Sequence, residues 1–179
     1  DPVDSVKRRV PIKVRAELSA SLLLGVFWWT HLRRSFLPLL GATDASIRYG
    51  FGASIPRVPV LLTRRIARWA EKQGAFIVMD GGTLPGDAAR RLGEAHHIDL
   101  SMDDFVDVLS VRRKYDDHIN GLEGEAFVLF LQWLLRTTRH HARRIVVLVD
   151  SAVWLGAAAR GRSSTRLNAI LRSAAALRM

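Results

Sequence analysis

The chain contains no cysteine. Neither a disulfide framework nor a thiolate zinc site can therefore form, and the redox compartment stays open. Lysine is also scarce, because of the 27 basic residues four are Lys7, Lys13, Lys72 and Lys114, and the other 23 are arginine. Arginine is always charged and its planar fork fits phosphate, so this bias favours nucleic acid as the partner class. A GC-rich genome would explain the same bias equally well.

Long apolar runs are absent too. The longest, residues 18–29 (LSASLLLGVFWW), contains two serines and falls short of the ~20 residues that a membrane-spanning helix needs. The sequence therefore predicts no membrane span. Asp1-Pro2 shows neither an initiator methionine nor a signal-peptide pattern, which predicts a processed or excised segment.

Charge is unevenly distributed along the 179 residues, which carry a formal net charge of +10. Residues 80–125 hold 11 of the 17 acidic residues and 5 basic ones, a balance of −6, so the rest of the chain carries +16. A basic body with one acidic band is typical of a phosphate-binding surface beside an acidic insertion, and a solvated acidic loop explains the band equally well. A hydrophobic content of 49% is enough for the core of one domain.

The hydrophobic pattern predicts an α/β fold. An amphipathic helix of about four or five turns begins near Pro11. It carries Val14, Leu18, Leu22, Val26 and Trp29 on one face, which is expected to pack against a sheet. Residues 145–149 (IVVLV) are typical of a central strand buried on both faces. Further strands are predicted at residues 36–43, 49–53, 75–79 and 105–111, and further helices at residues 61–73, 123–135, 151–159 and 164–178.

Two of these strands lead directly into an aspartate, Asp44 and Asp150. The carboxyl ends of parallel strands share one edge of a sheet, so the two carboxylates are expected on one rim. Glu123 falls on the inward stripe of the helix that follows, whereas Glu125 is turned about 200° away and is expected to be solvated or paired. Each acid alone could equally be a cap, a turn former or a surface residue.

Three carboxylates that meet in one place repel each other unless a cation lies between them. With oxygen ligands and no thiols, the pattern favours Mg²⁺ or Mn²⁺ over softer metals. Chain reach allows the meeting, because the helix after Glu123 advances by about 24 Å and the following loop and strand can return over most of that length.

Three motifs resemble the ribonuclease H-like domain of retroelement polyproteins, of the DIRS-like and protist reverse-transcriptase type. Residues 43–46 (TDAS) with 50–53 (GFGA) look like its first strand and turn. Residues 118–123 (HINGLE) resemble the start of its first long helix, and residues 146–151 (VVLVDS) resemble its fourth strand. The upstream residues 10–40 are similar to the connector before this domain, whereas residues 55–104 match poorly.

The resemblance implies a mixed sheet with flanking helices, apparently without the last strand and helix of the family. It divides the chain into a connector with an amphipathic helix (1–35) and a ribonuclease H-like domain (36–179) with an insertion at about 55–104. Implied activity is two-metal hydrolysis of the RNA strand of an RNA–DNA hybrid, with Asp44 bridging both ions and Glu123 and Asp150 completing the shell. Contacts to backbone phosphate would come from Arg160, Arg162 and Arg166. The sequence is equally compatible with three ordinary surface arginines.

Two departures leave the activity open. The turn after TDAS is one residue longer than is usual in the family, and the fourth carboxylate of the family has no counterpart before Met179. The alternative is a domesticated, non-catalytic, basic subunit that binds RNA within a larger ribonucleoprotein or organellar assembly. An intracellular, nuclear or organellar location fits either reading.

Overall fold

The computed structural model describes residues 10–24, 33–70, 75–79, 93–115 and 117–178. It divides the chain into two units, residues 1–33 together with 179, and residues 34–178. In the described part of the first unit the chain forms helix α1 (Ile12–Leu24). The predicted helix at this position is confirmed over these residues, and the last part of its predicted apolar face, Val26 and Trp29, lies outside the described residues.

The second unit is built on a mixed four-stranded sheet with the order β5-β2-β1-β6. Strands β1 (Phe36–Ser46) and β2 (Gly50–Ile55) form an antiparallel hairpin, and β5 (Val106–Val111) continues it on the far side of β2. Strand β6 (Arg144–Val149) lies parallel to β1. The predicted α/β class with a mixed sheet and flanking helices is therefore confirmed.

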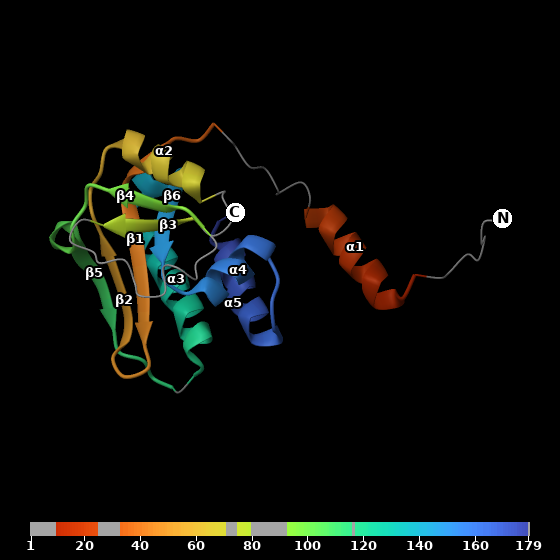
Figure 1. Ribbon diagram of the computed structural model, residues 1–179. Helices are drawn as coiled ribbons and strands as arrows, with labels where there is room; N and C mark the ends of the chain where they lie inside the picture. The colour runs from red at the N-terminus through yellow and green to blue at the C-terminus, as the bar shows by residue number, and fades with distance from the viewer. Residues whose placement is uncertain (1–9, 25–32, 71–74, 80–92, 116, 179) are drawn as a thin grey trace. The chain divides into compact units, whose positions relative to one another are not determined.

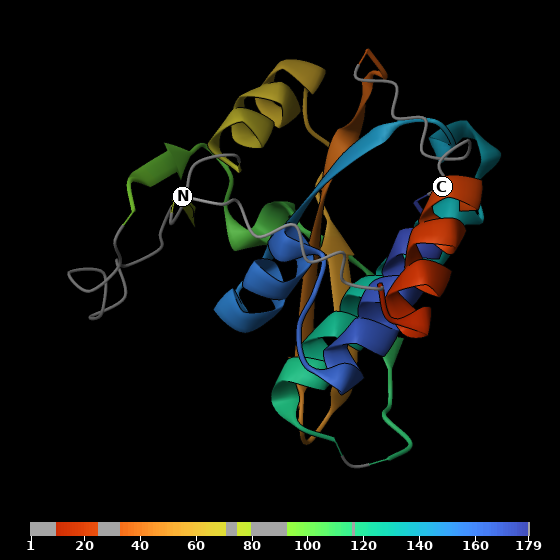
Figure 2. The ribbon, with the colours of Figure 1, turned by 90° about the vertical axis from the view of Figure 1, so that its right-hand side faces the viewer.

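Alternate residues of β1 face two different cores, as the two-residue period of a strand requires. Phe36 and Leu40 belong to a core shared with α2 (Val60–Trp69), and Leu37 and Leu39 belong to one shared with α3 (Ile119–Leu135). Figure 2 shows the two helices on opposite sides of the sheet. The site-bearing helix α3 is thus held against one face by a core that the strand pattern dictates.

A small parallel pair of strands lies outside the main sheet. Strand β3 (Phe76–Met79) pairs with β4 (Ala95–Ile98), and Ile98 packs in the same core as α2. Strand β4 was not predicted, because its sequence AHHI shows no alternation of apolar and polar residues. A short 3-10 helix, Met102–Asp104, leads on to β5.

Two final helices pack beside α3. These are α4 (Ala152–Arg160) and α5 (Thr165–Ala176), and both were predicted to within one or two residues. A Cβ on Gly124 of α3 would lie 2.8 Å from the Trp154 ring of α4 and 3.0 Å from Ile170 of α5. The helices therefore approach as closely as the missing side chain of Gly124 allows.

Two expectations about strands are wrong in detail. Strand β1 does not stop before Asp44 but runs on to Ser46, because residues 42–46 all pair with the returning strand β2. Strand β6 was expected in the centre of the sheet, but among the described strands it has only β1 as a neighbour. Its apolar run is still required, because Val146 and Val147 face cores on opposite sides of the sheet.

Figure 1 shows the resulting arrangement, with the β1–β2 turn and the start of α3 at the same end of the second unit. A 3-10 turn, Thr138–His140, joins α3 to β6 at the other end. None of the described helices combines the length and the apolar character that crossing a membrane requires.

Candidate metal centre

Asp44 and Asp150 are brought side by side by the register of the parallel strands. Thr43 of β1 is the partner of Val149 of β6, so the aspartates that follow these two residues lie in the same row. Asp150 is the residue directly after β6, and the Ser151 hydroxyl then accepts a hydrogen bond from the Trp154 N–H to cap α4. The sharp change from strand to helix leaves the Asp150 carboxylate at the edge of the sheet.

Glu123 approaches the same edge from α3. Neighbouring residues of the helix explain its direction, because Leu122 and Ala126 are fully buried against Ala45 and Phe51 of the hairpin. Glu123 itself is only 5% exposed. An acidic side chain is therefore buried on the sheet-facing side of a helix, where apolar residues would normally lie.

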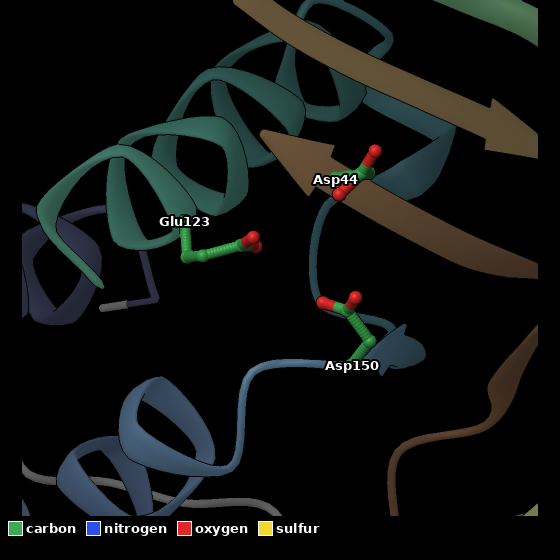
Figure 3. A group of neighbouring side chains, drawn as sticks. All are labelled: Asp44, Glu123 and Asp150. Carbon is green, nitrogen blue, oxygen red and sulfur yellow. The ribbon is translucent and has the colours of Figure 1, made fainter. Parts of the chain in front are cut away.

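The three carboxylates form one group. An oxygen atom from each of Asp44, Glu123 and Asp150 lies within 4.8 Å of the oxygens offered by the other two. Figure 3 shows the Glu123 side chain reaching from the helix toward the two aspartates. Asp44 and Asp150 are exposed, so the group is open to solvent on one side and closed by α3 on the other.

The surroundings of Glu123 disfavour a negative charge on its carboxylate. The pKa of Glu123 is raised from 4.5 to about 7, first by burial and then by the charges of Asp150 and Asp44, while a hydrogen bond from the Ala45 backbone lowers it. Glu123 Oε2 is buried and has no hydrogen-bond partner. Such an oxygen is costly unless it is protonated or bound to a cation.

The donor set suits a hard cation. All three ligands are carboxylate oxygens, the atoms that Mg²⁺, Mn²⁺ and Ca²⁺ prefer, and they lie close enough together to bind a metal ion. One Mg²⁺ holds its ligand oxygens up to about 4.2 Å apart, so small side-chain rotations would bring all three onto one ion. The buried, unpartnered Oε2 is the observation that fits a bound metal best.

Glu125 takes no part in this group, as its rotation around the helix predicted. Its carboxylate accepts a hydrogen bond from the Tyr115 hydroxyl, which is the main reason why the pKa of Tyr115 is raised to about 12. Asp80, the acid that follows the predicted strand 75–79, lies outside the described residues.

The three arginines expected to contact phosphate have different surroundings. Arg160 ends α4, Arg162 follows in the turn after Gly161, and both are exposed. Arg166 lies in the first turn of α5 and forms an ion pair with Asp117, just before α3. The pair brings the beginnings of α5 and α3 together at the carboxylate end of the unit.

Sequence reasoning missed a second group of cations at this end. A Cβ on Gly50 would lie 2.7 Å from the backbone nitrogen of Arg113 and 3.0 Å from Cα of Arg112, so the β1–β2 turn touches the segment after β5. We call four exposed residues of these two segments the basic rim; they are Arg48, Tyr49, Arg112 and Lys114. Gly52 pairs with both Asp44 and Ser110, and Arg112 is two residues beyond Ser110, about 7 Å along the strand.

A signal for the rim was present in the sequence. Residues 112–114 (RRK) follow directly on the predicted strand 105–111, but their closeness to Asp44 depends on which strands are neighbours. No protein-family model, no curated protein and no solved structure matches this chain.

Proposed function

We propose that the chain is a ribonuclease H-like nuclease that uses Mg²⁺ or Mn²⁺ to hydrolyse the RNA strand of an RNA–DNA hybrid. The observation that carries the proposal is the convergence of Asp44, Glu123 and Asp150, with one buried oxygen of Glu123 left without a partner. The three acids come from the strand, the helix and the strand end at which the resemblance expects them. The sheet order supports it as well, with three antiparallel strands and a fourth parallel to β1.

The carboxylates would hold the cation and orient it toward a scissile phosphate. Bound there, the metal would supply an activated water and stabilise negative charge on the leaving oxygen. Asp44 lies on β1, beside the end of β6 that leads to Asp150, and it is exposed, so a substrate can approach it from solvent. Glu123 is the buried member, so its deprotonation is coupled to occupation of the site.

Nucleic acid is favoured as the substrate by the charges around the carboxylates. The basic rim offers three cations and an exposed tyrosine, the side-chain types that contact phosphate and stack on bases. Tyr49 is 75% exposed, and the Arg48 guanidinium carbon lies 5.7 Å from the centre of its ring. Arg160 and Arg162 would add phosphate contacts on the α4 side.

Cleavage of a labelled RNA strand in an RNA–DNA hybrid, with single-stranded RNA and duplex DNA as comparison substrates, tests the proposal. Asp44→Asn and Asp150→Asn should each lower the Mg²⁺-dependent rate by more than the 10–100-fold that loss of an outer-shell partner typically costs. Asp103→Asn, an exposed acid on the 3-10 turn before β5, is the matched control and should cleave normally. Equal cleavage by the wild type and Asp44→Asn would contradict the nuclease proposal.

The second candidate is a non-catalytic RNA-binding subunit of a larger assembly. The basic rim favours it, because these cations can bind RNA whether or not a metal is present. The acids favour it too, because three carboxylates of the described residues gather at the site, whereas the family that the sequence resembles has four. In that case the wild type binds RNA with a strong salt dependence and Asp44→Asn binds equally well, while neither cleaves any substrate.

A further inference from the structure

An ion pair between a buried carboxylate and an exposed arginine lies next to the metal centre and takes no part in it. Asp117 precedes α3, its side chain is only 1% exposed, and its Oδ2 is paired with the Arg166 guanidinium of α5. Its other oxygen accepts a hydrogen bond from the His118 N–H, at the N-cap of α3. Arg166, whose side chain is exposed, is the charge partner of this carboxylate.

The Asp117 carboxylate of this pair contacts the turn of α3 that carries Glu123. A Cβ on Gly121 would lie 2.5 Å from Asp117 Oδ2, so the carboxylate touches the helix backbone two residues before Glu123. On the other side of Glu123, Gly124 is in contact with Trp154 and Ile170. Glu123 is therefore flanked by two close approaches, one to the ion pair and one to α4 and α5.

This turn of α3 also brings a third carboxylate close to two others. Ligand oxygens of Glu123, Asp44 and Asp150 lie within 4.8 Å of one another, and like charges this close repel each other unless a cation lies between them. A restraint at the helix start is needed to hold the carboxylate in place, because a displacement of about 1 Å can cost a site 100-fold in rate. Asp117 and Arg166 provide this restraint by joining the helix start to α5.

We propose that Asp117 and Arg166 are positioning residues for the metal centre. Their ion pair fixes the first turns of α3 and α5 together, and so keeps Glu123 at the spacing from Asp44 and Asp150 at which the three share a cation. This role rests on the proposed function, and it assigns Arg166 to the protein's own scaffold rather than to substrate phosphate.

Mn²⁺ binding by the full chain, measured by titration calorimetry or electron paramagnetic resonance, tests the role without any substrate. Asp117→Asn and Arg166→Gln should each lower the Mn²⁺ affinity by about tenfold, the lower end of what outer-shell partners contribute. Arg166→Lys keeps the charge and should recover most of the affinity. Arg172→Gln removes an exposed arginine six residues further along α5 and should bind Mn²⁺ as the wild type does.

Arg166→Gln leaves the buried charge of Asp117 unpaired and is expected to destabilise the fold. Asp117→Asn combined with Arg166→Gln leaves no unpaired charge, and circular dichroism would establish that it is folded at the temperature of the titration. Its affinity should be no lower than that of either single variant, because the two residues act as one pair, and it should still be below that of the wild type.

The outcomes separate the two proposals. If the wild type binds Mn²⁺ and the folded double variant binds it equally well, the positioning role is overturned and the metal centre stands. If Arg166→Gln instead weakens only hybrid binding, Arg166 contacts phosphate and the positioning role is again overturned. If the wild type binds no Mn²⁺, the proposed function fails, and the positioning role fails with it.

Discussion

Glu123→Gln should make the metal-free protein more stable at alkaline pH while weakening its metal centre. In the folded protein the pKa of Glu123 is about 7, against an ordinary value of 4.5. The unfolded chain thus releases this proton near pH 4.5, and the folded protein keeps it up to about pH 7. Raising the pH across this window therefore favours the unfolded chain.

The size of the effect follows from that difference in pKa. At 1.36 kcal/mol per pH unit, the rise from 4.5 to about 7 amounts to about 3 kcal/mol of unfolding free energy lost between these pH values. Glutamine does not ionise, its carbonyl oxygen can still accept the Ala45 hydrogen bond, and its amide can donate to Asp44 or Asp150. The variant should therefore exceed the wild type by up to about 3 kcal/mol at pH 8 without metal.

Urea unfolding at a series of pH values between 4 and 8, in the presence of a chelator, measures this directly. The informative quantity is the wild type minus Glu123→Gln, since other ionisable groups contribute equally to both. Saturating Mg²⁺ should stabilise the wild type, by about 2.7 kcal/mol at 100 times its dissociation constant, and should stabilise the variant much less. Asp103→Asn serves as the control and should show no such difference.

A difference that stays constant from pH 4.5 to 8 would refute the reasoning. It would mean that folding does not raise the pKa of Glu123, and hence that Glu123 is neither buried nor held beside Asp150 and Asp44 in solution.

Three further predictions concern packing, backbone conformation and the basic rim. Gly124→Ala places a methyl group 2.8 Å from the buried Trp154 ring and should cost about 1–3 kcal/mol of unfolding free energy and lower Mn²⁺ affinity. The Gly161→Ala variant meets nothing within 4 Å but has φ of +66°, so urea unfolding should show a loss of only about 1 kcal/mol and calorimetry an unchanged metal affinity. Arg48→Gln combined with Arg112→Gln should reduce the slope of log affinity for the hybrid against log salt concentration by about 2. Mn²⁺ binding should stay unchanged. An unchanged slope would show that the basic rim does not contact the hybrid.

Local sequence determined most of the elements that carry the site. The helical period of residues 126–134 predicted α3 and the inward direction of Glu123, and the β-branched run 145–149 predicted β6 with Asp150 at its end. These signals are readable because burial of one face repeats at the period of the element itself. The α/β class followed from the same patterns, and so did the separation of Glu125 from the site.

Tertiary structure decided what lies beside what. Whether β6 joins the sheet at its centre or edge, and whether residues 112–114 come near Asp44, depends on strand order and register, and these are set by contacts between distant segments. The Asp117–Arg166 pair joins residues 49 positions apart, and no local sequence pattern predicts it. Strand β4 owes its conformation to pairing with β3 and to the core beneath α2, and the three carboxylates meet only because that whole arrangement holds them against their mutual repulsion.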